Sequence, residues 1–281
     1  MMRREAVAAL AGAGWAAGSG GVGALDKYMD SAAGAALLLD VRGRSLLAAH
    51  NPTLANQSLL PPGSTVKPFV LEALLQAGKL RPDEPFPCPG KLTVAGHSLD
   101  CSHPRLAEAM RPRTALAYSC NCFVARMAER FAAGELERAL ASGGLGAPGA
   151  RLRRAATPDA VRLLALGERG VAATLAGLAA AYLRLALRLN QTASLRPVLE
   201  GLEDAVEYGT AQRAAIPGAV VAGKTGSVRS GAGVPHAWFA GFVPSRAPEA
   251  VVAVVLQGYS GGSDAAPAAG RILEAWRAGK L

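Results

Sequence analysis

The sequence predicts an α+β fold, in which a β-sheet is combined with a separate group of helices. Apolar runs with the length of strands lie near both ends of the chain, within 35–50 and within 220–257. Between them, residues 130–205 are rich in alanine, leucine and arginine, and their apolar residues recur with helical spacing. With 281 residues, 51% of them hydrophobic, the chain can bury a large core as one two-lobed domain or two small ones.

The first residues are typical of an export signal. Arg3 and Arg4 precede a soft apolar run from Ala6 to about Ala17, and a patch rich in glycine and serine follows. This run is too short to cross a bilayer but has the length of a signal-peptide core. A disordered N-terminus is the alternative. We expect residues 1–25 to be this leader, residues 26–281 to be the folded domain, and the protein to be exported to the periplasm or the extracytoplasmic face of the membrane.

A β-hairpin and a helix are expected next, and the first candidate site lies between them. Two apolar runs around a glycine-containing turn predict the hairpin over 35–50. Two prolines and a glycine then form a turn at 61–63, and the apolar run 69–75 predicts a helix. Ser64 therefore lies at the first helical turn, with Lys67 three residues later on the same face. A buried lysine can take the proton of a serine hydroxyl, and a helix N-terminus favours negative charge on a substrate oxygen. An ordinary capped helix is the alternative.

The four cysteines form two pairs. Cys88 and Cys101 flank a stretch that predicts a small β excursion, and a disulfide between them would close a short loop in an exported protein. Free thiols are a second interpretation. A metal site of Cys88, Cys101 and His103 is the third, although a fourth ligand at a recognisable spacing is missing. Cys120 and Cys122 are two residues apart at an expected helix start, so we expect no bond between them.

The second candidate site is Ser119-x-Asn121, which lies in a break between two expected helices. Residues 114–131 have helical spacing, interrupted near 118–121 by weak helix formers. A hydroxyl in such a loop can relay a proton, and an amide can hold a substrate amide. The alternative is an ordinary helix cap. Glu168, farther along, could act as a general base, but a position in a turn or on the surface is the preferred interpretation.

An apolar strand that ends in a cation, a hydroxyl and a glycine forms the third candidate site. Lys224 can supply charge for a substrate carboxylate or relay a proton, and Thr225 can bind that carboxylate. Gly226 permits close approach of the backbone. The N–H of Ser227 can pair with that of Ser64 as an oxyanion hole. The alternative is a plain edge strand that runs into a turn.

Two strands, at 237–242 and 250–257, and a helix at 265–278 complete the expected fold. The formal net charge is +9, but the arginines are scattered and no basic stripe interleaved with aromatic residues occurs, so we expect no nucleic-acid partner. A basic surface also suits an anionic envelope polymer or a membrane surface. Only six of the 30 basic residues are lysines, and Lys67 and Lys224 are two of them. Arginine could not replace Lys67 as a base, because it does not lose its proton.

Ser-x-x-Lys, Ser-x-Asn and Lys-Thr-Gly in this order resemble the motif set of penicillin-binding proteins and serine β-lactamases. The resemblance to the transpeptidase domain of penicillin-binding proteins covers almost the whole chain beyond the leader. It extends to Pro62–Pro68, the excursion at 88–101, and the segments Tyr208–Ala211 and Ala237–Phe242.

This resemblance implies the fold of the penicillin-recognising serine transferases and β-lactamases. Its antiparallel sheet is made from both ends of the chain, with helices on its faces and a helical lobe inserted between the two ends. The sheet lobe would then comprise about 30–60 and 205–281, the helical lobe about 64–204, and the site would lie between them.

The resemblance also implies acyl transfer on peptidoglycan stem peptides. Ser64, deprotonated by Lys67, would attack the bond between two terminal D-alanines, and Ser119 would relay the proton to the leaving amine with Lys224 nearby. The acyl group would pass to an amine of a neighbouring stem peptide or to water. Substrate would be bound by Asn121, Thr225, Gly226 and Ser227. β-Lactams would act as mimics, cell-wall assembly proteins are possible partners, and no cofactor or metal is expected.

Two other functions are carried as alternatives: a serine β-lactamase, and a non-catalytic penicillin-recognising sensor or scaffold. Ser227 stands where most penicillin-binding proteins have threonine, whereas β-lactamases often have serine or alanine. The deacylation devices of β-lactamases are not recognisable, however. Ala172 replaces the asparagine that class A enzymes have four residues after their glutamate, here Glu168, and the polar Asn121 stands where class D enzymes have valine or isoleucine. The presence of every motif residue argues against a non-catalytic domain.

Overall fold

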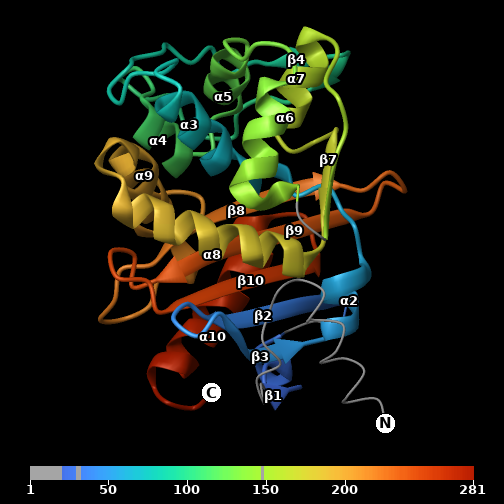
Figure 1. Ribbon diagram of the computed structural model, residues 1–281, viewed down its shortest axis with the longest axis vertical. Coiled ribbons are helices and arrows are strands. Elements are labelled where there is room, and N and C mark those ends of the chain that lie inside the picture. The colour runs from blue at the N-terminus through green and yellow to red at the C-terminus, as the bar shows by residue number, and fades with distance from the viewer. Residues whose placement is uncertain (1–20, 30–32, 147–148) are drawn as a thin grey trace.

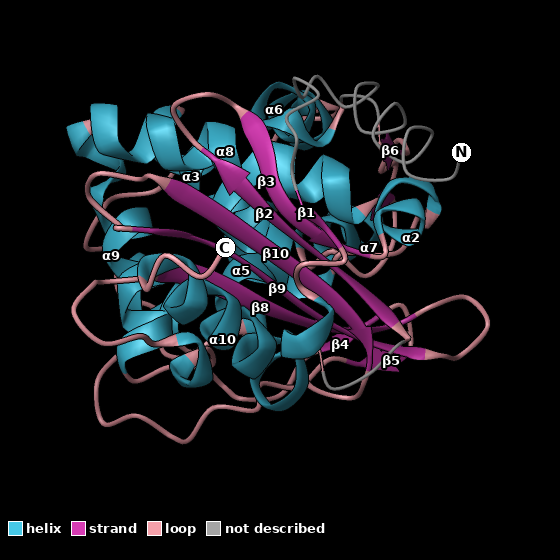
Figure 2. Ribbon diagram, turned by 90° about the horizontal axis from the view of Figure 1, so that it is seen from below, coloured by secondary structure: helices cyan, strands magenta, loops and turns pink. Residues whose placement is uncertain are grey.

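The computed structural model describes residues 21–29, 33–146 and 149–281. A six-stranded sheet has helices on both faces, and a further group of helices covers one side of it (Figures 1 and 2). The strand order across the sheet is β1-β3-β2-β10-β9-β8. Neighbouring strands are antiparallel except β1, which runs parallel to β3, so the sheet expected from the resemblance is confirmed with one parallel pair at its edge.

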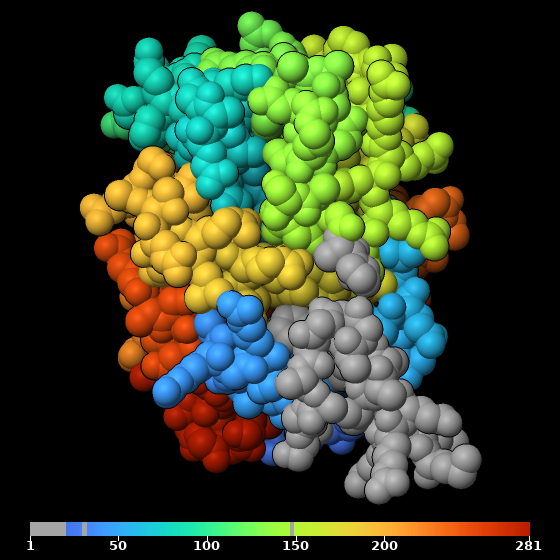
Figure 3. Space-filling model, in the orientation of Figure 1, coloured from blue at the N-terminus to red at the C-terminus, as the bar shows by residue number. Residues whose placement is uncertain are grey.

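The strands of this sheet come from the two ends of the described chain. They are β1 (Gly21–Val22), β2 (Gly34–Asp40), β3 (Ser45–His50), β8 (Ala222–Arg229), β9 (Pro235–Val243) and β10 (Ala250–Gln257). Two short pairs lie apart from it: β4 (Thr93–Val94) with β5 (His97–Ser98), and β6 (Ala150–Leu152) with β7 (Val171–Ala173). Figure 3 shows blue and red segments together in the lower half of the molecule, with teal to yellow segments above them.

The α-helices lie between the two groups of strands, except α10, which follows β10. They are α2 (Pro52–Gln57), α3 (Lys67–Gln76), α4 (Pro112–Ala117), α5 (Asn121–Ala128), α6 (Glu135–Leu140), α7 (Pro158–Ala165), α8 (Leu175–Gln191), α9 (Arg196–Glu207) and α10 (Ala266–Arg277). No helix in these described parts is both long enough and apolar enough to cross a membrane.

The described residues begin inside the predicted leader, at Gly21. The predicted leader falls mostly on residues 1–20, which lie outside the described residues. The folded domain begins before residue 26, because Gly21 and Val22 already pair with β3 and Leu25 is fully buried. The pair β6–β7 was not predicted, since strands of three residues are too short to show an alternating pattern.

The sheet is buried on both faces, which explains its apolar sequence. In β2, Ala36 and Leu38 belong to one hydrophobic cluster, which includes residues of α10. Leu37 and Leu39 belong to the other cluster, which includes residues of α3 and α8. Successive side chains of a strand point to opposite faces, so a strand covered on both sides is apolar throughout. Figure 2 shows α10 and α8 on opposite sides of the strands.

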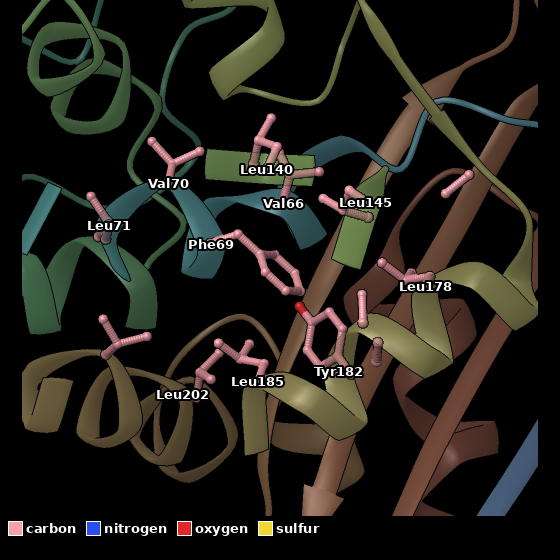
Figure 4. Close-up of a cluster of buried hydrophobic side chains, with 14 of the residues drawn as sticks. Val66, Phe69, Val70, Leu71, Leu140, Leu145, Leu178, Tyr182, Leu185 and Leu202 are labelled. Atoms are coloured by element: carbon pink, nitrogen blue, oxygen red, sulfur yellow. The ribbon is translucent and has the colours of Figure 1, made fainter. Parts of the chain in front are cut away.

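Helix α8 connects the sheet to the turn that carries Ser64. Tyr182 of α8 meets Phe69 of α3 edge to face, with ring centroids 5.5 Å apart (Figure 4). The hydroxyl of Tyr182 donates a hydrogen bond of 2.8 Å to the carbonyl oxygen of Thr65, one residue after Ser64. Both residues are fully buried, so this carbonyl group depends on a protein donor rather than on water.

We expect Tyr182→Phe to lower the free energy of unfolding by about 1–3 kcal/mol, because it leaves the buried carbonyl of Thr65 without its donor. Urea titration followed by circular dichroism measures this change. Tyr259→Phe is the matched control, because Tyr259 is 77% exposed, and it should stay within about 0.5 kcal/mol of the parent. Equal stability of both variants would show that the bond to Thr65 contributes nothing.

Candidate active site

Ser64 lies in a tight turn that is held by its backbone. The 3₁₀ turn η2 (Gly63–Val66) runs directly into α3, as the sequence predicts. Gly63, at φ +54°, donates its N–H to the carbonyl oxygen of Gly167 at 3.0 Å. Gly167, at φ +75°, must be glycine, because a Cβ there would lie 2.0 Å from the carbonyl oxygen of Gly63. The turn that presents Ser64 is therefore clamped against the segment around Gly167.

Lys67 joins the first candidate motif to the second. Its side chain is fully buried, and Nζ donates to the carbonyl oxygen of Ser119 at 2.7 Å, to Ser119 Oγ at 3.2 Å, and to Asn121 Oδ1. Ser119 adopts φ +55° in the break between α4 and α5, where the sequence predicts an interruption. Burial lowers the pKa of Lys67 to about 8, although negative groups nearby oppose this shift. The ammonium group is thus fully partnered yet able to lose its proton near neutral pH.

The third candidate motif forms the edge strand β8 beside this turn. Lys224 is fully buried, and its Nζ donates to the carbonyl oxygen of Thr225 at 3.2 Å. Burial, together with the charge of Lys67, lowers the pKa of Lys224 well below its usual value. Thr225 is nearly buried, and its hydroxyl lies 2.9 Å from that of Thr210.

Glycine allows β8 to approach the turn closely. A Cβ on Gly226 would lie 2.7 Å from the carbonyl oxygen of Pro62, and a Cβ on Gly63 would lie 3.5 Å from the backbone nitrogen of Ser227. The backbones of the first and third motifs are therefore in contact. The fold brings all three motifs to one place, between the sheet and the helices.

Sequence reasoning missed three features of the site. The hydroxyl of Thr210 contacts that of Thr225. In the sequence, Thr210 was noted only as part of the segment Tyr208–Ala211, which resembles the family. The hydroxyl of Ser227 accepts a hydrogen bond of 2.9 Å from the N–H of Gly261, which fixes the end of β8. Glu168 lies in a turn as expected, but it is half-buried rather than on the surface, and burial raises its pKa while Lys67 opposes this.

A cavity of about 890 Å³ begins beside these motifs. Its wall includes Glu168 and Ser227. Four arginines also line it: Arg151, Arg153, Arg169 and Arg229. Because Glu168 is the one carboxylate among the described residues of this wall, the lining carries net positive charge.

The structure has no disulfide between Cys88 and Cys101, which was one of the three interpretations of these residues. All four cysteines are free, and the sulfur atoms of Cys88 and Cys101 are 3.7 Å apart. Cys101 does not pair with one partner, because its sulfur also lies 3.7 Å from that of Cys120 and 3.5 Å from that of Cys122. Cys120 and Cys122 are likewise free thiols.

Comparison with known proteins places this arrangement in a family. The family model of the penicillin-binding protein transpeptidase domain matches residues 34–182 and 190–274. The chain belongs to this family. The match includes every residue of the three candidate motifs.

One curated relative and two solved structures show what the chain and its fold are similar to. The peptidoglycan D,D-transpeptidase PbpA of Mycobacterium tuberculosis is 26% identical over 309 residues, which cover 82% of this chain and 62% of that protein. The chain thus spans less than two thirds of that relative. Among solved structures, PBP2 of Pseudomonas aeruginosa has a TM-score of 0.78 at 22% identity, over 90% of this chain and 76% of its own. The transpeptidase domain of penicillin-binding protein 3 of Burkholderia pseudomallei has the same TM-score and identity, over 92% of both chains.

NMR titration of the lysine side chains measures whether burial lowers the pKa of Lys67, as the structure indicates. The six lysines, labelled with ¹³C at Cε, should include one signal that titrates near pH 8 and disappears in Lys67→Gln. Lys91 is the internal reference, because its hydrogen bond to Asp100 raises its pKa. If all six signals titrate together at the ordinary value for lysine, the buried environment of Lys67 is wrong.

Proposed function

We propose that this chain is a serine acyltransferase that acts on peptidoglycan stem peptides as a D,D-transpeptidase, with D,D-carboxypeptidation when water is the acceptor. The observation that supports this most is the buried Lys67, which connects the helix of Ser64 to Ser119 and Asn121. Its lowered pKa makes it a competent base near neutral pH, where an ordinary lysine is not.

Each motif residue has a role in the proposed reaction. Ser64 Oγ gives its proton to Lys67 Nζ and forms an ester bond with the carbonyl carbon of the penultimate D-alanine. The amide C–N bond breaks, and the leaving amine takes its proton through Ser119, with Lys224 nearby. The N–H groups of Ser64 and Ser227 stabilise the oxyanion, and the close approach of the first and third motifs is consistent with that role. An amine or water then attacks the ester carbonyl carbon, the bond to Ser64 Oγ breaks, and Oγ regains the proton that the acceptor gives up.

The remaining residues are proposed to bind the substrate. Asn121 holds the amide of the donor peptide, and Gly226 leaves room for its backbone. Thr225 binds the terminal carboxylate, with Thr210 as its hydroxyl partner. The arginines that line the cavity favour the anionic parts of the stem peptide. β-Lactams that carry a carboxylate would occupy the same place and acylate Ser64.

The reaction takes place outside the cytoplasm, where peptidoglycan is cross-linked, and the chain would act at the extracytoplasmic face of the membrane or in the periplasm. The name of the mycobacterial relative, a peptidoglycan D,D-transpeptidase, supports this proposal. Cell-wall assembly proteins are the macromolecular partners that such a reaction calls for.

Covalent labelling by benzylpenicillin tests whether Ser64 is the nucleophile. We expect one adduct per chain, located by mass spectrometry on the peptide that contains Ser64. Ser64→Ala should abolish the adduct, and Lys67→Ala should nearly abolish it, because the hydroxyl loses its base. An adduct that survives Ser64→Ala would exclude Ser64 as the nucleophile.

The lifetime of this adduct separates the three candidate functions. A transpeptidase should keep the label for minutes to hours and process stem peptides, whereas a sensor keeps the label without processing them. A β-lactamase clears it and hydrolyses a chromogenic cephalosporin over many turnovers. Glu168 is half-buried and is the carboxylate that we considered as a base for deacylation. We expect Glu168→Gln to leave the lifetime of the penicilloyl adduct unchanged. A Glu168→Gln adduct that lives much longer than the parent's would favour the β-lactamase.

We expect Thr225→Val to slow acylation by carboxylate-bearing β-lactams by about 10- to 100-fold. The substitution keeps the shape of the side chain but removes a charge-assisted hydrogen bond worth about 1.5–3 kcal/mol. Thr53→Val, at an exposed position of α2, is the control and should acylate at the parent rate. Equal rates for all three proteins would show that Thr225 does not contact the carboxylate.

A further inference from the structure

Four potential metal ligands converge beside the Ser119–Asn121 loop, outside the catalytic groups described above. They are the sulfur atoms of Cys88, Cys101 and Cys120 and the Nε2 atom of His103, and all four atoms lie within 4.8 Å of one another. Cys120 is buried, and the other three residues are half-buried. Spacing along the chain did not reveal Cys120 as the fourth ligand, because it follows His103 by 17 residues and lies on a different segment.

The distances between these atoms match the edges of a tetrahedron around Zn²⁺. Zinc bound to sulfur at about 2.3 Å and to nitrogen at about 2.0–2.1 Å requires S···S edges of about 3.8 Å and S···N edges of about 3.6 Å. Cys88 lies 3.7 Å from Cys101 and 3.5 Å from Cys120, and Cys101 lies 3.7 Å from Cys120. Nε2 of His103 lies 3.6 Å from the sulfur of Cys88.

The groups around the ligands are those that a thiolate–imidazole site requires. Nδ1 of His103 lies 2.8 Å from the carbonyl oxygen of Pro104, so it carries the ring proton there and leaves the lone pair of Nε2 facing the sulfurs. Each sulfur also accepts a backbone N–H at 3.4 Å. These donors are Gly90 to Cys88, Cys122 to Cys101, and Phe123 to Cys120. Such hydrogen bonds stabilise negative charge on sulfur and orient the ligands.

We propose that Cys88, Cys101, His103 and Cys120 form a structural Zn²⁺ site. Three thiolates and an imidazole are soft to borderline ligands, which select zinc over hard cations such as Mg²⁺ or Ca²⁺. Four protein ligands close the coordination sphere, so the metal has no open position for water or substrate. The site therefore holds the structure and does not take part in acyl transfer.

The metal would hold the second catalytic motif in place. Cys120 lies between Ser119 and Asn121, both of which contact Lys67. On the other side, Nδ2 of Asn121 donates to the carbonyl oxygen of Leu99 at 3.0 Å, two residues before Cys101. Zinc would thus tie the segment at 88–103 to the loop of Ser119 and make both positioning contacts of Asn121 rigid. Its four ligands are positioning residues, and this part of the inference rests on the proposed function.

The test measures metal content first, independently of activity. The full chain, prepared with thiols reduced and exchanged against Zn²⁺, should retain one equivalent by elemental analysis. Co²⁺ in its place should give the visible spectrum of a tetrahedral thiolate site. Cys88→Ser should weaken zinc binding by more than about 100-fold, since even outer partners of metal sites are worth about 10–100-fold. His103→Gln, at a half-buried loop position, provides a second ligand variant in case the first does not fold.

Cys122→Ser is the matched control. Its sulfur lies 3.5 Å from that of Cys101 but outside the group of four, so the variant should keep one equivalent of zinc. Zinc lost equally from Cys122→Ser and Cys88→Ser, a parent chain that binds neither Zn²⁺ nor Co²⁺, or an intact mass that shows a disulfide in place of metal would each overturn the proposal.

Acylation is the second readout. His103→Gln should react with benzylpenicillin about 10-fold more slowly than Cys122→Ser, and excess Zn²⁺ should restore part of the loss. Acylation that is identical with and without bound zinc would overturn the positioning role. A zinc-binding chain that forms no penicilloyl adduct at all would refute the proposed function and leave the metal site standing.

Discussion

The structure around the site depends on giving the buried ammonium group of Lys67 protein acceptors in place of water. An ammonium ion that is removed from water loses several kcal/mol of hydration unless protein groups replace its partners. Here, Ser119 and Asn121 supply three oxygen acceptors, two of them side-chain groups and one a main-chain carbonyl. This requirement explains why the chain breaks between α4 and α5 at Ser119, where a continuous helix could not aim the same three acceptors at one cation. The buried position of Lys67 and the break in the chain at Ser119 therefore follow from one electrostatic constraint.

Much of the fold follows from patterns within short segments. The hairpin of β2 and β3, the strands β9 and β10, and helix α10 each carry their own apolar pattern and turn residues, so they could be predicted within a few residues of their ends. The three motifs could also be predicted, because Ser64 and Lys67 are three residues apart and Ser119 and Asn121 are two apart. Because only six of the 30 basic residues are lysines, a lysine at a motif position is less expected by chance and is stronger evidence for the motif.

What could not be predicted depends on contacts between distant segments. The burial of Glu168 results from the packing of its turn against Gly63, more than 100 residues earlier in the chain. Thr210 reaches Thr225 only because α9 leads back to the edge of β8. The cysteines illustrate the same point most clearly. Two pairs suggested a local loop closure, but the fold brings members of both pairs and a histidine to one centre.

The contact between Gly63 and Gly167 has a consequence for how this site can change over time. The position of Ser64 is fixed by two main chains in direct contact, one of which tolerates no Cβ. Single substitutions therefore have few ways to move the serine and still leave a folded protein. In the proposed reaction, adaptation to a new inhibitor or a new acceptor would instead use the rim of the cavity. There, Arg151, Arg153 and Arg229 are exposed and can be exchanged at little cost to folding. Substitutions are therefore poorly tolerated at the centre of the site and well tolerated at its entrance.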